Sequence, residues 1–396
     1  MKLLPKIALG VALTSGMCGI AAETQQQADR EVFDRVSALM PGEKNGMTVI
    51  NGRNFNSGIA LMLKELPGKL EADGMDCAPM VEYGIGILGE LWDASGLADV
   101  KALGIADAVV SEDPVIGENF MIYYTGKEPS GWMKECSGEQ VDVLSIAGNW
   151  PESTIYAFDF AMNLTPVAQF IQNKLPDGVE IPPVAVGIAM ALDGRYDVII
   201  AEDADGRKLL RVQMPDSENG TIFGLMLSLA DSIGAEKNAQ EIVISDLEGI
   251  SGEIIISRIE NGILISNCRD IDARIAELPK LGDSKDFAAL SSGLPKTGNA
   301  CAYAGKKILN PMLSKDMGNK DLADIEFFVD PGYDSRMLGV SRLTGEGLVG
   351  QARCFGTFGE YQAANARMQI RVMRDVIMNE IKNAGCDEAD DEEVEE

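Results

Sequence analysis

The chain has 396 residues, with 62 acidic side chains against 34 basic ones and no histidine, and its formal charge is −28. Apolar residues make up 46% and charged residues 24%, as in an ordinary globular protein. The missing imidazole excludes serine–histidine triads, cysteine–histidine dyads, histidine zinc sites and histidine-ligated haem. The acidic balance argues against binding to nucleic acid or to an anionic membrane surface.

Residues 1–22 have the pattern of a signal peptide. Lys2 and Lys6 form a positive start, residues 7–20 are mostly apolar, and Ala22 suits a cleavage site. A buried N-terminal helix is the alternative for this stretch. We expect export to the periplasm or the medium, with a mature chain that starts near Glu23.

Cys18 raises the question of a lipid anchor. Bacterial lipoprotein signals place a small residue just before the cysteine, and Met17 fits that position poorly. Soluble export is therefore favoured over lipidation. No later segment has the 18 or so unbroken apolar residues of a transmembrane helix, so no transmembrane segment is expected.

Helices then alternate with short strands and hairpins along the chain. In residues 23–150, in chain order, we expect a helix at 28–39, a strand near 47, helices at 57–66 and 80–94, and a hairpin joining 106–110 to 120–125. The glycines Gly84, Gly86 and Gly89 have the spacing of a nucleotide-binding loop. They lie inside a helical stretch, which favours close helix packing instead.

In residues 151–283 the turn chemistry predicts two hairpins. Asn261-Gly262 is a favoured two-residue turn, and Asp205-Gly206 ends an acidic turn that fails the spacing of a calcium loop. The elements expected here are a strand at 154–160, helices at 165–175, 221–233 and 269–278, and hairpins joining 196–201 to 209–214 and 253–259 to 263–267.

In residues 284–386 the last helix has the clearest start signal. Thr357 and Glu360 form a capping box, an apolar stripe follows, and Gly385 suits the end. Before it we expect a strand at 300–304, a helix at 306–314 and a hairpin joining 337–341 to 348–353. Residues 387–396 hold eight acids and are expected to form a disordered tail.

The order of these elements repeats. Residues 154–233 and 300–384 both begin with a strand and a helix and end with a hairpin and a helix, and a weaker copy starts at Met47. We therefore predict an α+β fold of imperfectly duplicated units, with antiparallel hairpins covered by helices on one face. The unit borders expected are 1–22, 23–150, 151–283, 284–386 and 387–396.

Six cysteines remain after the leader, and an even number in an exported chain suggests disulfides. Pairing neighbours in sequence gives Cys77–Cys136, Cys268–Cys301 and Cys354–Cys386. Free buried thiols are the alternative. None of the six forms a C-x-x-C motif, so a zinc or redox site is not expected.

The region from 249 to 305 contains a strand, a helix, an S-x-x-F stretch and an L-P pair before a further strand. Ser284, Phe287, Leu294 and Pro295 occupy these positions. This pattern resembles a loosely defined family of large exported bacterial proteins of unknown function. The resemblance implies repeated α+β domains and an exported location, and it brings no catalytic residues.

Carboxylates are the remaining route to catalysis, because two acids can hydrolyse a glycosidic or a peptide bond without histidine. The Asp-Thr-Gly pattern of pepsin-like proteases is absent. Asp159, between two phenylalanines in a strand, and Asp330, before Pro331-Gly332, are the candidate acids. A solvent-facing strand residue and a turn residue are the simpler interpretations.

Two functional hypotheses follow. The first is an exported, non-enzymatic protein that binds a partner, such as a protein or glycoprotein, or assembles in the envelope, without a cofactor or a metal. The alternative is a secreted carboxylate-dependent hydrolase, such as an aspartic-type peptidase that acts on extracellular protein or glycoprotein. Removing the leader and the tail changes the net charge only from −28 to −22, so the folded part is acidic in either case.

Overall fold

The computed structural model describes residues 23–40, 42–52, 56–58, 61, 65, 68, 78–174, 183–247, 250–260, 262–309, 320–321, 327–329, 334–357, 359–360 and 363. The expected leader with Cys18, the acidic tail and most of the final helix lie outside these residues. So do Asp330, Cys77 and Cys386.

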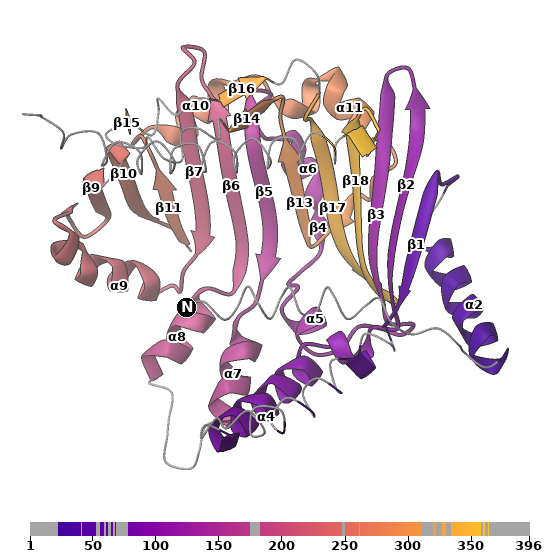
Figure 1. The fold of residues 1–396 in the computed structure, drawn as a ribbon. Helices are drawn as coiled ribbons and strands as arrows, with labels where there is room; N and C mark the ends of the chain where they lie inside the picture. The colour runs from indigo at the N-terminus through magenta and orange to yellow at the C-terminus, as the bar shows by residue number, and fades with distance from the viewer. Residues whose placement is uncertain are drawn as a thin grey trace, which may run out of the picture.

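One large sheet of fourteen strands runs through the molecule (Figure 1). Along its main path the order is β1-β2-β3-β18-β17-β13-β5-β6-β7-β11-β10-β9-β8, and every neighbouring pair on this path is antiparallel. The short β15 (Lys320–Asp321) pairs in parallel with β10. The predicted α+β class with antiparallel hairpins is confirmed.

The strand bounds on the main path, in chain order, are β1 Gly46–Asn51, β2 Ala102–Glu112, β3 Val115–Tyr124, β5 Thr154–Met162, β6 Gly194–Glu202, β7 Lys208–Pro215, β8 Glu236–Lys237, β9 Glu241–Leu247, β10 Ile250–Ile259, β11 Gly262–Ser266, β13 Ala300–Ala304, β17 Met337–Thr344 and β18 Gly347–Phe355. Two further pairs lie off this sheet: β4 (Val141–Asp142) with β12 (Thr297–Gly298), and β14 (Lys307–Leu309) with β16 (Phe327–Val329).

Two similar sets of strands follow one another along the chain, and in the sheet each set places its hairpin beside the strands of the other set. The structure divides into two repeats, residues 23–234 and 235–396, which differ from the unit borders expected from the sequence. The first repeat supplies the meander β1-β2-β3, then β5, then the hairpin β6-β7. The second supplies β9-β10-β11, then β13, then β17-β18. The two single strands β5 and β13 pair at the centre. Each repeat's hairpin, however, pairs with the other repeat's meander, β18 with β3 and β7 with β11.

Short segments beside α6 (Val143–Gly148) and α11 (Lys285–Ser291), near the centre of the sheet, also pair each repeat with the other. The strand before α6 pairs with the strand after α11. In turn Pro151, after α6, bridges to Lys280, before α11. The two repeats are therefore interlocked around an approximate two-fold relation.

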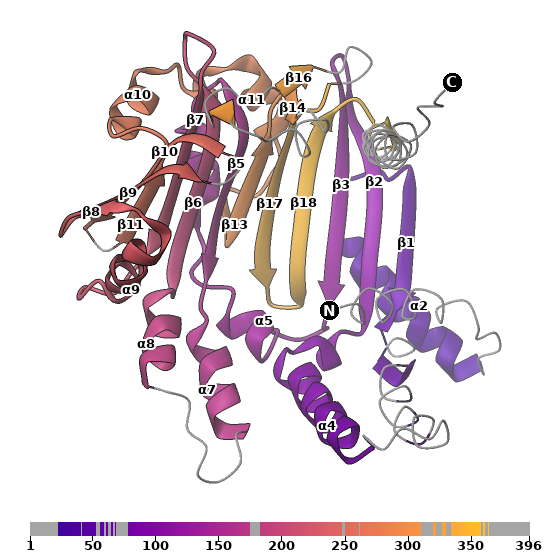
Figure 2. The same ribbon diagram turned by 60° about the vertical axis from the view of Figure 1, so that its left-hand side comes forward.

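Helices cover both faces of the sheet at different places, so the expectation that they cover one face is wrong. On the face that carries Ala157 and Cys301, here called the α6 face, α6 and α11 bury the main core, which includes Trp150, Phe287 and Leu290. On the opposite face, here called the α9 face, α9 (Thr221–Ala230) covers Ile242, Ile256 and Ile263. Figure 2 shows α9 at the β8–β11 end and α2 (Glu23–Ala38) at the β1 end.

The remaining helices lie at the two ends of the strands. Figure 1 shows α4, α5, α7 and α8 below the sheet and α10 above it. Their bounds are α4 Ala78–Ala94, α5 Trp132–Glu135, α7 Thr165–Lys174, α8 Pro183–Ala191 and α10 Ile271–Glu277, with single turns of 3-10 helix at Leu97–Asp99, Asp231–Ile233 and Leu281–Asp283. Gly84, Gly86 and Gly89 lie inside α4, as expected.

Most expected elements are present, and one is wrong. The predicted helix at 306–314 begins as strand β14, because residues 307–309 pair with β16 and place Ile308 opposite Phe328. Pairing with a strand about 20 residues further along the chain overrides the local helical spacing. In the described part of the chain, no helix is long and apolar enough to cross a membrane.

The expected Cys268–Cys301 disulfide is absent. Cys301 lies on β13, whereas Cys268 follows β11, which is four strands away. Four strand spacings amount to roughly 19 Å, far beyond the reach of a disulfide. Cys136, Cys268, Cys301 and Cys354 are all free thiols. The expected partners of Cys136 and Cys354, which are Cys77 and Cys386, lie outside the described residues.

Candidate functional site

Asp159, one of the two acids singled out in the sequence, is buried at the centre of the sheet. Its side chain is 3% exposed, whereas its neighbour Phe158 on the other face is 45% exposed. Strand alternation therefore turns Asp159 toward the α6 face, not toward solvent. Asp330 lies outside the described residues.

A second acid stands directly beside it. Asp197 on β6 is the register partner of Asp159 on β5. Side chains in such positions have Cβ atoms about 5 Å apart. Burial raises the pKa of Asp197, against the lowering influence of Arg211 and of the Trp150 hydrogen bond. The structure thus brings together two carboxylates, of which the sequence indicated only one.

Each of these carboxylates is bonded to its own arginine. Arg195 donates from Nε to Asp159 over 2.7 Å, and Arg211 donates from Nη1 to Asp197 over 2.5 Å. The indole of Trp150, itself 2% exposed, donates to Asp197 over 3.1 Å. An acid pair that shares a proton needs two uncompensated charges. Here both charges are already compensated.

A neighbouring thiol is equally unsuited to nucleophilic chemistry. Cys301 pairs across β13 and β5 with Asp159, and its side chain donates to the Val143 carbonyl. Burial and the nearby carboxylate raise the pKa of this thiol. A raised pKa keeps sulfur in its neutral, unreactive form. Among the described residues no group of three or more acids or cysteines could hold a metal ion.

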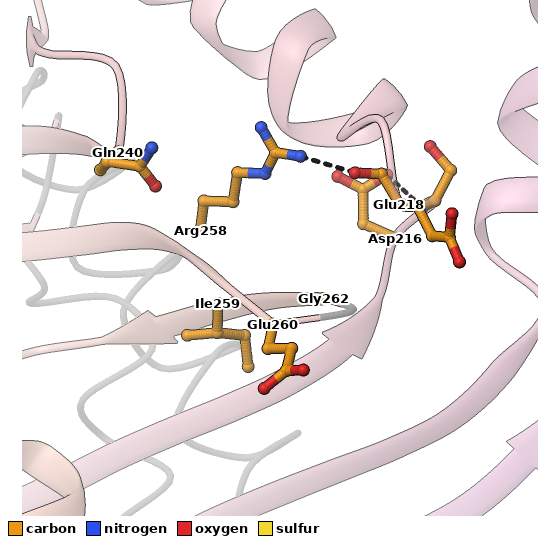
Figure 3. Close-up of a pocket in the computed structure, with 8 residues that line it drawn as sticks. Asp216, Glu218, Gln240, Arg258, Ile259, Glu260 and Gly262 are labelled. Atoms are coloured by element: carbon orange, nitrogen blue, oxygen red, sulfur yellow. Dashed lines mark hydrogen bonds between the residues drawn. The ribbon is translucent and has the colours of Figure 1, made fainter.

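A polar pocket of about 420 Å³ lies at the start of α9 (Figure 3). The loop between β7 and α9 forms one side, and the turn of the β10–β11 hairpin forms the other. Its lining residues are Asp216, Ser217, Glu218, Gln240, Arg258, Ile259, Glu260 and Gly262. The volume falls within the range of small-molecule sites, roughly 300–1,000 Å³.

Arg258 is the only basic residue in this lining. It is half-buried on β10, and its guanidinium donates to the backbone carbonyl of Glu218 over 2.8 Å (Figure 3). No ion pair joins it to a carboxylate of the described residues. By contrast Arg195, Arg211, Arg336 and Arg353 are all salt-bridged.

Gly220 makes room for this guanidinium. It has φ +69° and directly precedes α9, and a Cβ built on it would lie 2.8 Å from Cζ of Arg258. Only glycine adopts this left-handed conformation readily and leaves the space open. The position of Arg258 therefore depends on a particular residue of the facing loop.

Asp216 holds that loop in place. Its two carboxylate oxygens accept hydrogen bonds from the backbone N–H groups of Ile222 and Phe223, at 2.9 and 3.0 Å. Both groups belong to the first turn of α9, which has no partners for them inside the helix. Asp216 is therefore committed to capping, while Glu218 and Glu260 are exposed at the pocket.

Sequence reasoning missed Arg258 and the arginine partners of the acids. A signal was present for Arg195, although it stands one residue before the predicted strand 196–201. It lies two residues before Asp197, and side chains at this spacing share a face of a strand. Arg258 lies three residues before the Asn261-Gly262 turn, but nothing local shows that it faces a loop 40 residues earlier.

Comparison of the chain with protein-family models, with curated proteins and with solved structures finds no match.

Proposed function

We propose that this protein is a non-enzymatic binding protein whose ligand carries a free carboxylate that Arg258 binds. The observation that carries the proposal is a half-buried guanidinium, in a 420 Å³ pocket, with a backbone carbonyl as its described partner. A guanidinium binds carboxylates through paired N–H donors. Glu218 and Glu260 can receive an ammonium group of the same ligand.

A short peptide or the end of a protein chain has both charges, which agrees with the expectation of a protein or glycoprotein partner. Capture of a terminal carboxylate or amine is a known mode of peptide recognition. The probe is diglycine, titrated calorimetrically into the chain that starts at Glu23. Two matched probes, diglycine amide and N-acetyldiglycine, each lack one of the two charges.

We expect diglycine to bind more tightly than either matched probe. Arg258→Ala should weaken diglycine binding about tenfold or more, since a hydrogen bond to a charged group contributes about 1.5–3 kcal/mol. Gly220→Ala should weaken it too, because the new Cβ displaces the guanidinium. Arg207→Ala, on the exposed β6–β7 turn, is the control. Equal binding of diglycine and its amide would contradict the proposal.

The alternative is a carboxylate-dependent hydrolase. The opposed pair Asp159 and Asp197 supplies two neighbouring carboxylates for it, while the arginine bonded to each of them argues against a shared proton. Catalysis by a pair of carboxylates produces an activity optimum at acidic pH. Peptidase and glycosidase assays from about pH 3 to pH 8 test this, with Asp159→Asn and a pepstatin-type inhibitor. If the wild type turns over a substrate and the folded Asp159→Asn variant does not, the protein is a hydrolase and the proposal of a non-enzymatic binding protein is wrong.

Export is the second part of the proposal. It is supported by the leader pattern of residues 1–22. In a bacterial host, mass spectrometry of the full-length product should find a chain starting near Glu23 in the periplasm or the medium. A lipid-modified Cys18 at the N-terminus would indicate anchoring instead, and an intact Met1 in the cytoplasm would contradict export.

A further inference from the structure

A second pocket, of about 320 Å³, lies on the α6 face at the end of the sheet next to α11. The start of β5, the end of β13 and the first turn of α11 surround it. Its lining residues are Glu152, Ser153, Thr154, Ile155, Glu202, Leu281, Ser284, Asp286, Tyr303, Gly305, Lys306, Lys307 and Arg336. It shares no residue with the pocket that contains Arg258.

Thr154 brings an unpaired hydroxyl to this pocket. The residue is 4% exposed, and its Oγ1 is buried without a hydrogen-bond partner in the described part of the structure. A buried polar group left without a partner is destabilising, because it has lost its hydrogen bonds to water. Native proteins rarely retain such a group without a water molecule or a ligand to satisfy it.

Tyr303 adds a second hydroxyl. The residue is 4% exposed on β13 and lines the pocket. Burial raises the pKa of this phenol to about 12, so that it stays neutral and able to donate. Both hydroxyls come from the two central strands, one from each repeat.

The charged residues of the lining divide into bonded and unbonded groups. Arg336 is bonded to Asp334 and Asp286 and stacks on Phe355, with Cζ 4.1 Å from the ring centroid. Lys307 is bonded to Glu202. Lys306 and Glu152 are exposed, and neither forms an ion pair with a described residue.

We propose that this pocket binds a small hydroxylated carboxylate, such as a sugar acid or a hydroxy acid. Lys306 binds the carboxylate, and Thr154 and Tyr303 hydrogen-bond hydroxyl groups of the ligand. Glu152 accepts from a further hydroxyl, while Arg336 and Lys307 stay in their ion pairs. The binding step is non-covalent and is independent of the diglycine site.

The first test is calorimetric titration with D-glucuronate and with L-malate. Glucose, which lacks the carboxylate, and acetate, which lacks hydroxyls, are the matched probes. We expect at least one hydroxylated carboxylate to bind more tightly than both matched probes. Thr154→Val, Tyr303→Phe and Lys306→Gln should each weaken that binding several-fold. Lys296→Gln, another exposed lysine, and Arg258→Ala should leave it unchanged.

A stability measurement keeps the test independent of the choice of ligand. If the Thr154 hydroxyl is unpaired in the free protein, Thr154→Val removes an unsatisfied polar group and should leave the melting temperature equal or higher. A clear drop in the melting temperature would show that the hydroxyl has a partner and would overturn the proposal. The proposal would also be overturned if the variants bound D-glucuronate and L-malate as tightly as the wild type does. The same holds if the wild type bound neither ligand at millimolar concentration.

Discussion

At the scale of single residues, the acidic chain uses partly buried arginines to neutralise buried acids. Asp159 is 3% exposed and bonded to Arg195, which is 24% exposed. Removing one partner of a buried pair leaves the other charge uncompensated. We therefore expect Asp159→Asn to lower the free energy of unfolding by about 3 kcal/mol, measured by urea denaturation at neutral pH.

The control for this change lies on the same face. Asp272 accepts from Arg211 over 2.7 Å but is 63% exposed. Exposed ion pairs contribute about 0–1 kcal/mol, so Asp272→Asn should have a small effect. Equal losses from the two substitutions would show that burial does not set the strength of these pairs.

Glu202 should make stability depend on acid pH. Burial alone would raise its pKa, but hydrogen bonds from Lys307 and Lys208 outweigh this and lower the pKa below 4.5. A depressed folded-state pKa stabilises the protein above the unfolded-state value, and this contribution is lost as the pH falls through the folded-state value. Glu202→Gln should thus be destabilising at pH 7 and progressively less so below about pH 4.5.

Urea titrations of the wild type and Glu202→Gln at neutral and acidic pH measure this difference. Glu139→Gln is the control, because Glu139 is exposed and forms no ion pair with the described residues. A difference between wild type and Glu202→Gln that stays constant with pH would contradict the assignment.

At the scale of elements, local chemistry predicted most of what the structure contains. The β10–β11 hairpin that pairs Ile259 with Gly262, the acidic turn before Gly206 and the Thr357–Glu360 capping box all need only neighbouring residues. Glu360 N–H donates to Thr357 Oγ1 over 3.2 Å, and Thr357 N–H donates back to the Glu360 carboxylate over 2.8 Å. Strand β14 could not be predicted in this way, because its partner strand is remote.

The two central helices begin with equivalent caps. Asp142 accepts from the Ser145 N–H of α6 over 2.9 Å, and Ser284 accepts from the Phe287 N–H of α11 over 3.0 Å. Loss of such a cap costs about 1 kcal/mol. We expect Asp142→Ala to lower the unfolding free energy by this amount in chemical denaturation. Glu139→Ala, just before the cap, should not, and equal effects would show that the cap is unimportant.

At the scale of the whole molecule, the sequence did not predict that each repeat's hairpin pairs with the meander of the other repeat. The repeated element order is visible in the chain, yet any meander could pair with the hairpin of its own repeat. The choice is made by pairings such as Glu118 opposite Arg353, which are 235 residues apart and ion-paired over 2.6 Å. Asp159 was a candidate acid for local reasons, with a solvent-facing strand residue as the simpler interpretation. Its burial and its surroundings depend on the same long-range register.

This interlocking predicts how the chain behaves when it is divided. A cut between Gly234 and Ala235 separates the repeats, and each half then loses the partner of its hairpin and of its central strand. Open strand edges of this kind promote association. We expect residues 23–234 and 235–396, expressed separately, to be aggregated or unfolded, and to co-purify as a 1:1 complex when expressed together. Circular dichroism and size-exclusion chromatography distinguish these states. A monomeric, cooperatively unfolding 23–234 fragment would show that the first repeat closes its own sheet without the exchange.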